Sequence, residues 1–159
     1  ITPQTISAYS GGAGGTPLVA IYNPVGSGRN AVILKASVAN VVAAAGAGTV
    51  TWGLYFGQTA AITQATTTAS TNCITQSATG SLVTGFRNVA LTSSTAASNV
   101  IAVGSYYWAT AAGAVQTGGI IDLEGSLIIP PGSYAALGGS AALTSATWIG
   151  SLQWEEVPI

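Results

Sequence analysis

The sequence predicts an all-β protein, an antiparallel β-sandwich or barrel of about eight strands. Short runs rich in Val, Ile, Thr, Tyr and Trp alternate with clusters of Gly, Pro, Asn and Ser, which is typical of strands joined by turns. Helix signals are weak, because Glu, Lys, Arg and Leu are scarce and the 21 glycines recur every few positions. A chain of 159 residues suits one domain of this kind.

The first half of the chain predicts four strands. Each is a run of β-branched or aromatic residues bounded by turn-forming residues. Residues 58–80 are rich in Thr, Ala and Ser and weakly patterned, which predicts a long surface loop with room for one edge strand. The expected strands are residues 17–22, 31–42, 49–56 and 82–86.

The second half continues the pattern. Residues 88–98 are polar and predict another connection, and the assignment stays open over residues 109–118. The C-terminal part is the clearest, because its apolar runs alternate with a strong turn signal. The expected strands are residues 100–110, 119–124, 127–129, 134–137 and 147–157.

Two turns stand out by their residue types. Asn-Pro followed by spaced glycines favours a turn after the first strand, and Pro-Pro-Gly forces one late in the chain. These turns have a structural role in the prediction. The turn residues are Asn23, Pro24, Gly26, Pro130, Pro131 and Gly132.

Residues 1–16 are expected to form a flexible arm, and residues 17–159 a single domain. Four glycines lie between Gly11 and Gly15, a composition typical of flexible segments. A phosphate-binding loop is excluded here, because the Lys-Ser/Thr ending and the strand-to-helix context are missing. In an assembly, such an arm could reach a neighbouring subunit.

The charge content excludes several classes of function. There are only three basic residues, Arg29, Lys35 and Arg87, too few to neutralise the phosphates of a nucleic acid. The absence of histidine excludes histidine-based catalysis and histidine metal sites, and no cofactor is expected. A chain that is 48% hydrophobic with a net charge of −1 is not a disordered one. Its uncharged stretches are interrupted by Ser, Thr, Asn and Gly, so no membrane partner is expected.

Four short blocks resemble the cement or decoration proteins that attach to the outside of tailed-bacteriophage capsids. The first is YNPVGSGRN at residues 22–30, which runs into AVILKASV at residues 31–38. The others are WGL at residues 52–54, EGSLIIPPGSY at residues 124–134 and WEEVPI at residues 154–159. The motifs consist of turns and strands and cover a minority of the chain.

This resemblance implies a jelly-roll sandwich that forms a homotrimer and bridges neighbouring subunits of the major capsid protein. It also implies a location on the outer capsid surface, and it carries over no catalytic residue. The composition supports a structural role independently, because a surface with so few charges is expected to be hidden in lasting interfaces. A closed trimer would also cover sheet edges that lack protecting lysines.

Two acidic pairs in the last quarter of the sequence are candidate sites. Asp122 and Glu124 are two residues apart on an expected strand, so both carboxylates share a face. They could serve glycoside hydrolysis or bind calcium, or they could lie at a solvated strand end or form ion pairs with a basic side chain. Glu155 and Glu156 are adjacent and face opposite ways, one toward solvent or a basic group of a partner and the other toward a buried arginine, so they support no active site.

An aromatic group offers the alternative function, that of a receptor- or carbohydrate-binding head domain of a phage tail fibre or adhesin. Trp52, Tyr55, Tyr106 and Trp108 could form a binding platform for a ligand or partner. The other interpretation is that they pack in the core and in interfaces, where aromatic residues are frequent. The single cysteine, Cys73, has no histidine to activate it and is expected to be structural or incidental.

Overall fold

The computed structural model describes residues 3–9, 11, 15–42, 48–59, 80–87, 99–108 and 118–159. Within these residues the chain is all-β, as predicted, with nine strands and no helix, and so none long and apolar enough to cross a membrane. Predictions for Cys73 and for the connections at residues 60–79, 88–98 and 109–117 lie outside the described residues. The strands are β1 (Gln4–Ile6), β2 (Val19–Asn23), β3 (Arg29–Val42), β4 (Gly48–Thr59), β5 (Thr84–Arg87), β6 (Asn99–Trp108), β7 (Gly118–Ile129), β8 (Ser133–Gly139) and β9 (Leu143–Pro158).

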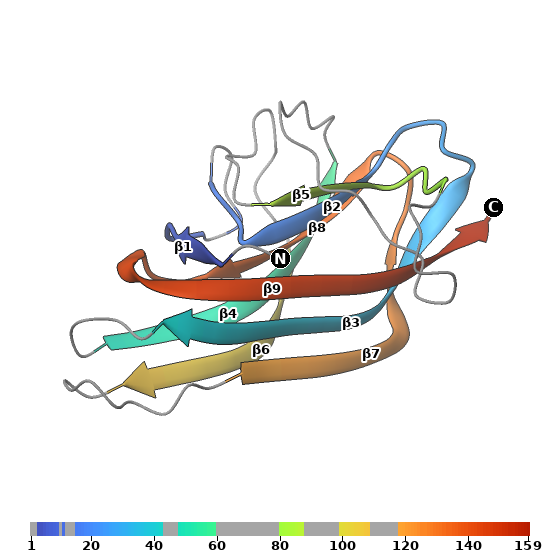
Figure 1. Cartoon of the computed structure of the whole chain (residues 1–159). Helices are drawn as coiled ribbons and strands as arrows, with labels where there is room; N and C mark the ends of the chain where they lie inside the picture. The colour runs from blue at the N-terminus through green and yellow to red at the C-terminus, as the bar shows by residue number, and fades with distance from the viewer. Residues whose placement is uncertain are drawn as a thin grey trace.

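The strands form two antiparallel sheets, a layout compatible with a β-sandwich (Figure 1). One sheet has the order β1-β9-β3-β7, and the other has the order β5-β2-β8-β4-β6. The pairing is nested around the middle of the chain: β1 pairs with β9, β2 with β8, β3 with β7 and β4 with β6. As a result, the turns that follow β2 and β7 come to the same end of the molecule.

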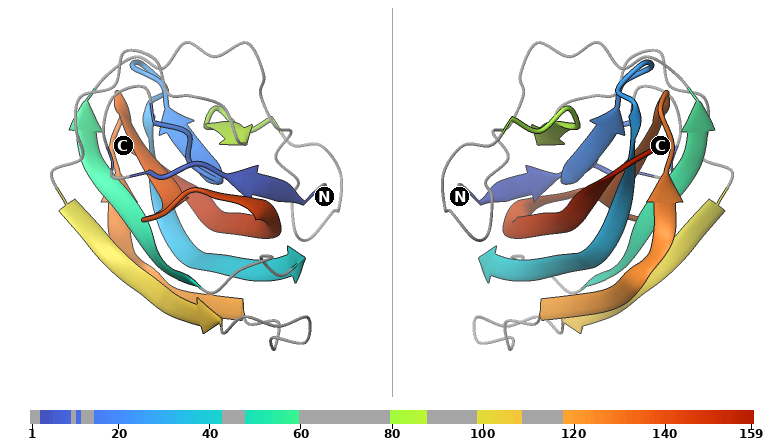
Figure 2. Two further views of the ribbon diagram at one scale, coloured as in Figure 1. Left: turned by 90° about the vertical axis from the view of Figure 1, so that its left-hand side faces the viewer. Right: turned by 90° about the vertical axis from the view of Figure 1, so that its right-hand side faces the viewer.

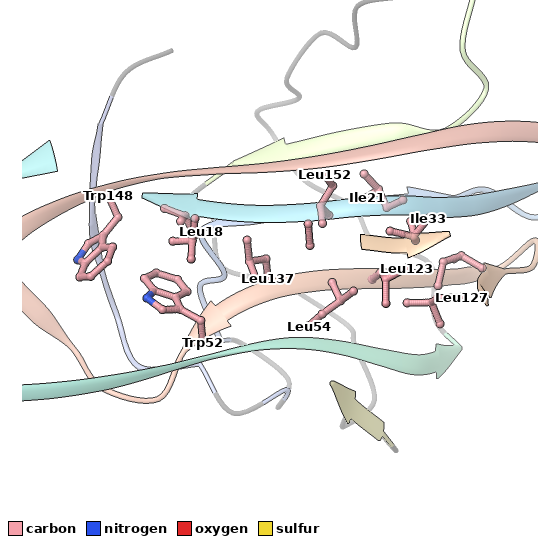
Figure 3. Packing of buried hydrophobic residues seen from close by; sticks show 14 of the residues in the cluster. Leu18, Ile21, Ile33, Trp52, Leu54, Leu123, Leu127, Leu137, Trp148 and Leu152 are labelled. Carbon is pink, nitrogen blue, oxygen red and sulfur yellow. The ribbon is translucent and has the colours of Figure 1, made fainter. Parts of the chain in front are cut away.

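The main core lies between the two sheets and is built from alternate residues of facing strands. Trp52 and Leu54 of β4 face Trp148 and Leu152 of β9 across it, and all four are buried (Figure 3). The rings of Trp52 and Trp148 are 5.0 Å apart, a packing distance for aromatic pairs. This alternation is why the period-2 patterns of the sequence predicted the strands.

A second buried cluster lies on the opposite face of the five-stranded sheet. Every residue of β8 is buried, which means that both of its faces are covered. Tyr9 packs there against Tyr55 with ring centroids 5.1 Å apart, and its backbone amide donates to the carbonyl of Gly139 at 2.8 Å. A Cβ at Gly138 would clash with the Tyr9 ring, so a glycine is required beneath it.

Two features differ from the expected elements. Residues 119–124 and 127–129 belong to one strand, β7, instead of two. Glu124 (φ 48°) and Gly125 (φ 76°) form an irregularity within it that resembles a turn in sequence. Within residues 1–16, which were expected to be an arm, the structure places β1 and the buried Tyr9.

Candidate functional site

The two turns that the sequence predicted meet at one end of the molecule, here called the turn end. It consists of residues 24–28, 130–132, 80–83 and 157–159. The amide of Gly132 donates to the carbonyl of Asn23 at 2.7 Å, and the amide of Ile159 donates to the carbonyl of Gly28 at 3.1 Å. Figure 2 shows the C-terminus of β9 close to the turns that follow β2 and β7. Three stretches that are far apart in sequence are therefore joined.

Both predicted turns are closed by their own hydrogen bonds. The amide of Ser27 donates to the carbonyl of Pro24 at 3.1 Å, and the amide of Ser133 donates to that of Pro130 at 3.1 Å. Gly26 (φ 79°) and Gly132 (φ 82°) adopt left-handed conformations that favour glycine. Pro131 lies inside the second turn. The turn chemistry predicted from the sequence is confirmed.

The side chain of Asn23 connects the two turns from the inside. Asn23 is fully buried, and its Nδ2 donates to the carbonyl of Arg29 at 2.7 Å and to that of Ile129 at 2.9 Å. These carbonyls belong to the start of β3 and the end of β7. Because buried carbonyls need a donor, one amide group holds two strand ends in place.

Glu156 performs a similar task on the other side of the turn end. Its carboxylate accepts hydrogen bonds from the Ser81 hydroxyl and from the amides of Leu82 and Val83 at 3.3 and 3.4 Å. Arg29 lies 3.9 Å away, and it is exposed rather than buried as one sequence interpretation required. Burial alone would raise the pKa of Glu156, but the hydrogen bonds from Ser81, from these two amides and from Trp154 outweigh it and lower the pKa.

The outside of the turn end is apolar. Among the described residues, most of the large hydrophobic side chains exposed to solvent lie on it or beside it. Val25 is 79% exposed, yet its side chain leans over Gly132. Among the described residues, one ion pair lies at this end, between Arg29 and Glu156, and its two opposite charges cancel. The exposed apolar residues are Val25, Leu82, Ile128, Val157 and Ile159.

The predicted aromatic platform is divided between two faces of the five-stranded sheet. Trp52 and Tyr106 point into the main core, where the Tyr106 ring lies 5.7 Å from that of Trp148. Tyr55 points to the opposite face and packs against Tyr9. Trp52 and Tyr106 therefore pack in the core. The side chain of Trp108 lies outside the described part of the structure.

Sequence reasoning missed two of the aromatic residues that organise these clusters. Trp148 has a signal, because Ala146, Trp148 and Leu152 follow the period-2 pattern of an inward-facing strand. Tyr9 has none, because it precedes a glycine-rich stretch and its burial depends on pairing with β8.

The two candidate carboxylates of β7 lie on the surface. Asp122 Oδ2 is 3.1 Å from Lys35 Nζ on β3, so the ion-pair interpretation is confirmed for Asp122. Asp122 Oδ1 also accepts from the amide of Glu124 at 3.1 Å. The Lys35 hydrogen bond, followed by the one from Glu124, lowers the pKa of Asp122.

No group of three or more Cys, Asp or Glu side chains that could hold a metal occurs among the described residues. Comparison of the chain with protein-family models, with curated proteins and with solved structures gave no match.

Proposed function

We propose that this chain is a non-enzymatic structural protein of a bacteriophage virion. It decorates the outer surface of the capsid and stabilises it by bridging subunits of the major capsid protein. The observation that carries the proposal is the turn end, which is held from within by Asn23 and Glu156 and presents exposed apolar side chains outside. Such a surface suits lasting contact with another protein.

The topology supports the proposal. Nested antiparallel pairing of the first strand with the last, and so on inward, is how a jelly roll is built from a folded hairpin. We therefore assign the two sheets to a jelly-roll sandwich, an architecture that viral capsid and lectin domains use. This assignment agrees with the short blocks of sequence that resemble decoration proteins.

The mechanism of stabilisation would be linkage. A protein that binds the assembled lattice and not its separate subunits stabilises the lattice by its binding free energy. Several contacts within one homotrimer, the assembly implied by the resemblance, would strengthen this effect by raising the effective concentration at each site. Rigidity of the turn end favours tight contact, since little conformational freedom is lost on binding.

The low charge of the turn end makes the proposal testable with salt. Attachment through apolar and neutral polar groups should weaken little when salt is raised, because there are few charges to screen. We expect the purified protein to co-sediment with capsids of its source phage at both low and high salt. Release by moderate salt would contradict the proposed contact.

A pair of matched variants tests where the contact lies. Val25→Asp places a charge on the exposed tip of the turn end, and Ile120→Asp places the same charge on an exposed position of β7 away from it. We expect Val25→Asp to reduce capsid binding at least tenfold and Ile120→Asp to leave it nearly unchanged. Equal loss in both variants would contradict a role for the turn end.

The same preparation distinguishes the alternative function. A receptor- or carbohydrate-binding head domain would bind glycans saturably and would be present in only a few copies per particle. We do not favour this function, because Trp52 and Tyr106 are buried in the core.

A further inference from the structure

The four edge strands of the two sheets differ in how well they are protected. Exposed edges carry unpaired backbone groups that can pair with another chain, and proteins usually protect them by shortness, charge or irregularity. β1 has three residues, and β5 has four and ends in Arg87. β7 is long but carries Asp122, Glu124 and the irregularity at Glu124 and Gly125.

β6 lacks the first two of these protections, shortness and charge, and its irregularity is limited to one extra residue. It forms one edge of the five-stranded sheet, spans ten residues and contains neither a charged residue nor a proline (Figure 1). The pairing with β4 leaves one extra residue, Val103, in β6, which increases its twist but adds no charge. Val100 is 56% exposed, and Ala102 and Ser105 are exposed as well.

The direction of the free backbone groups of β6 follows from its neighbour. Thr51 of β4 accepts from the amide of Ser140 at 2.9 Å and donates its own amide to the Ser140 hydroxyl at 3.0 Å. The backbone groups of Thr51 therefore point away from β6. In an antiparallel pair, opposite residues either bond each other or both point away, so Ser105, opposite Thr51, directs its amide and carbonyl to the open edge.

The same alternation applies along the strand. Gly53 and Tyr55 have the orientation of Thr51, and their partners are Ala102 and Val100. Three residues of β6 thus direct donors and acceptors, in extended conformation, to an edge that no other strand of the described part of the chain covers. An extended strand is the ligand that such an edge takes.

We propose that β6 pairs antiparallel with β6 of a second copy of this chain across a two-fold axis, which joins two five-stranded sheets into one. The second copy is the occupant favoured by charge. When a strand pairs with the same strand of a second copy, a charged residue near the two-fold axis lies close to the same charge of the other copy, which destabilises the pair. β6 carries no charged residue. β7 would bring Asp122 and Glu124 close to their counterparts.

The test is the mass of the purified protein in solution, with no capsid present, so its outcome is independent of the proposed capsid function. We expect the wild type to have an even number of copies at high concentration, whether as a dimer or as two joined trimers. Ser105→Pro should halve this mass. The substitution removes an amide that points outward, so the ladder with β4 is kept.

Two further variants control for folding and for the side chain. Ala102→Lys keeps the backbone amide, adds a like charge on both sides of the axis and should also halve the mass, an effect that high salt reduces. Ser105→Ala removes the hydroxyl that contacts Thr51 and should leave the mass unchanged. A wild type that stays monomeric at all concentrations, or a mass unaffected by both Ser105→Pro and Ala102→Lys, overturns the proposal.

A second measurement, amide hydrogen exchange, tests directly whether the edge of β6 is paired. Hydrogen exchange at the amides of Val100, Ala102 and Ser105 should slow when the wild-type protein is concentrated. Equal exchange in dilute and concentrated samples that differ in mass would show that the copies meet elsewhere.

Discussion

The turn end and the exposed face of β3 and β7 each hold one ion pair, and the two pairs differ in what surrounds them. At the turn end, the carboxylate of Glu156 is largely shielded and accepts bonds from a neighbouring chain segment. On the sheet face, the carboxylate of Asp122 on β7 is half exposed and forms an ion pair with Lys35 on the neighbouring strand β3. The ion pair of Glu156 connects distant parts of the fold, while the ion pair of Asp122 connects only two neighbouring strands, β3 and β7.

The difference shows that burial and the number of bonded segments decide what a polar group contributes. Asn23 is uncharged, but it is the most buried of these groups and bonds two strand ends. We therefore expect the free energy of unfolding to depend most on Asn23, less on Glu156 and least on Asp122.

The largest effect is expected for Asn23→Ala. The substitution removes the Asn23 donor from the buried carbonyl of Ile129 and leaves the carbonyl of Arg29 with the Ser27 hydroxyl, which should lower the free energy of unfolding by about 3 kcal/mol. Denaturant unfolding measures this loss. A decrease below about 1 kcal/mol would mean that water replaces the amide and that the turn end is not held from within.

Glu156→Gln should have an intermediate effect. The amide keeps one acceptor oxygen but loses the charge that strengthens the bonds from Ser81 and from the amides of Leu82 and Val83, a cost of about 2 kcal/mol. The same unfolding experiment applies. Stability equal to that of the wild type would show that these bonds do not need the carboxylate charge.

The pH dependence of the unfolding free energy distinguishes the contribution of Glu156 from that of Asp122. Both groups have a lowered pKa in the folded protein, so each contributes stability above its ordinary pKa that is lost as the pH falls through the folded-state value. For Glu156, this loss begins below its ordinary value of 4.5. We expect the unfolding free energy of Glu156→Gln to decrease less than that of the wild type as the pH falls. Asp122→Asn should keep most of the decrease seen in the wild type.

The smallest effect is expected for Asp122→Asn at neutral pH. Exposed ion pairs contribute little, because solvent screens them and two flexible side chains must be held together. The unfolding midpoint in denaturant should match that of the wild type within error. A loss as large as that in Glu156→Gln would remove the contrast between the two regions.

Local chemistry explains what the sequence could predict. The two turns of the turn end follow from Asn-Pro, spaced glycines and Pro-Pro-Gly, and most strands follow from alternation, because these signals act within a few residues. The same logic misassigned the middle of β7, where Glu124-Gly125 has turn-like residues but continues the strand.

Long-range contacts were beyond the sequence. The bond from Asn23 to Ile129 spans 106 positions, and the contact between Trp52 and Trp148 depends on two strands of different sheets. The residue types of its turn mark Asn23 as a turn residue but give no reason for its burial. The register of β3 and β7 determines that Asp122 pairs with Lys35 and not with another basic residue.

The most direct test of the proposed capsid role is the copy number of this chain in purified particles of its source, measured against the major capsid protein. We expect a ratio near that of the capsid lattice, as a protein that binds every equivalent position would show. A few copies per particle would place the chain on a tail or fibre, and its complete absence would contradict a role in the virion.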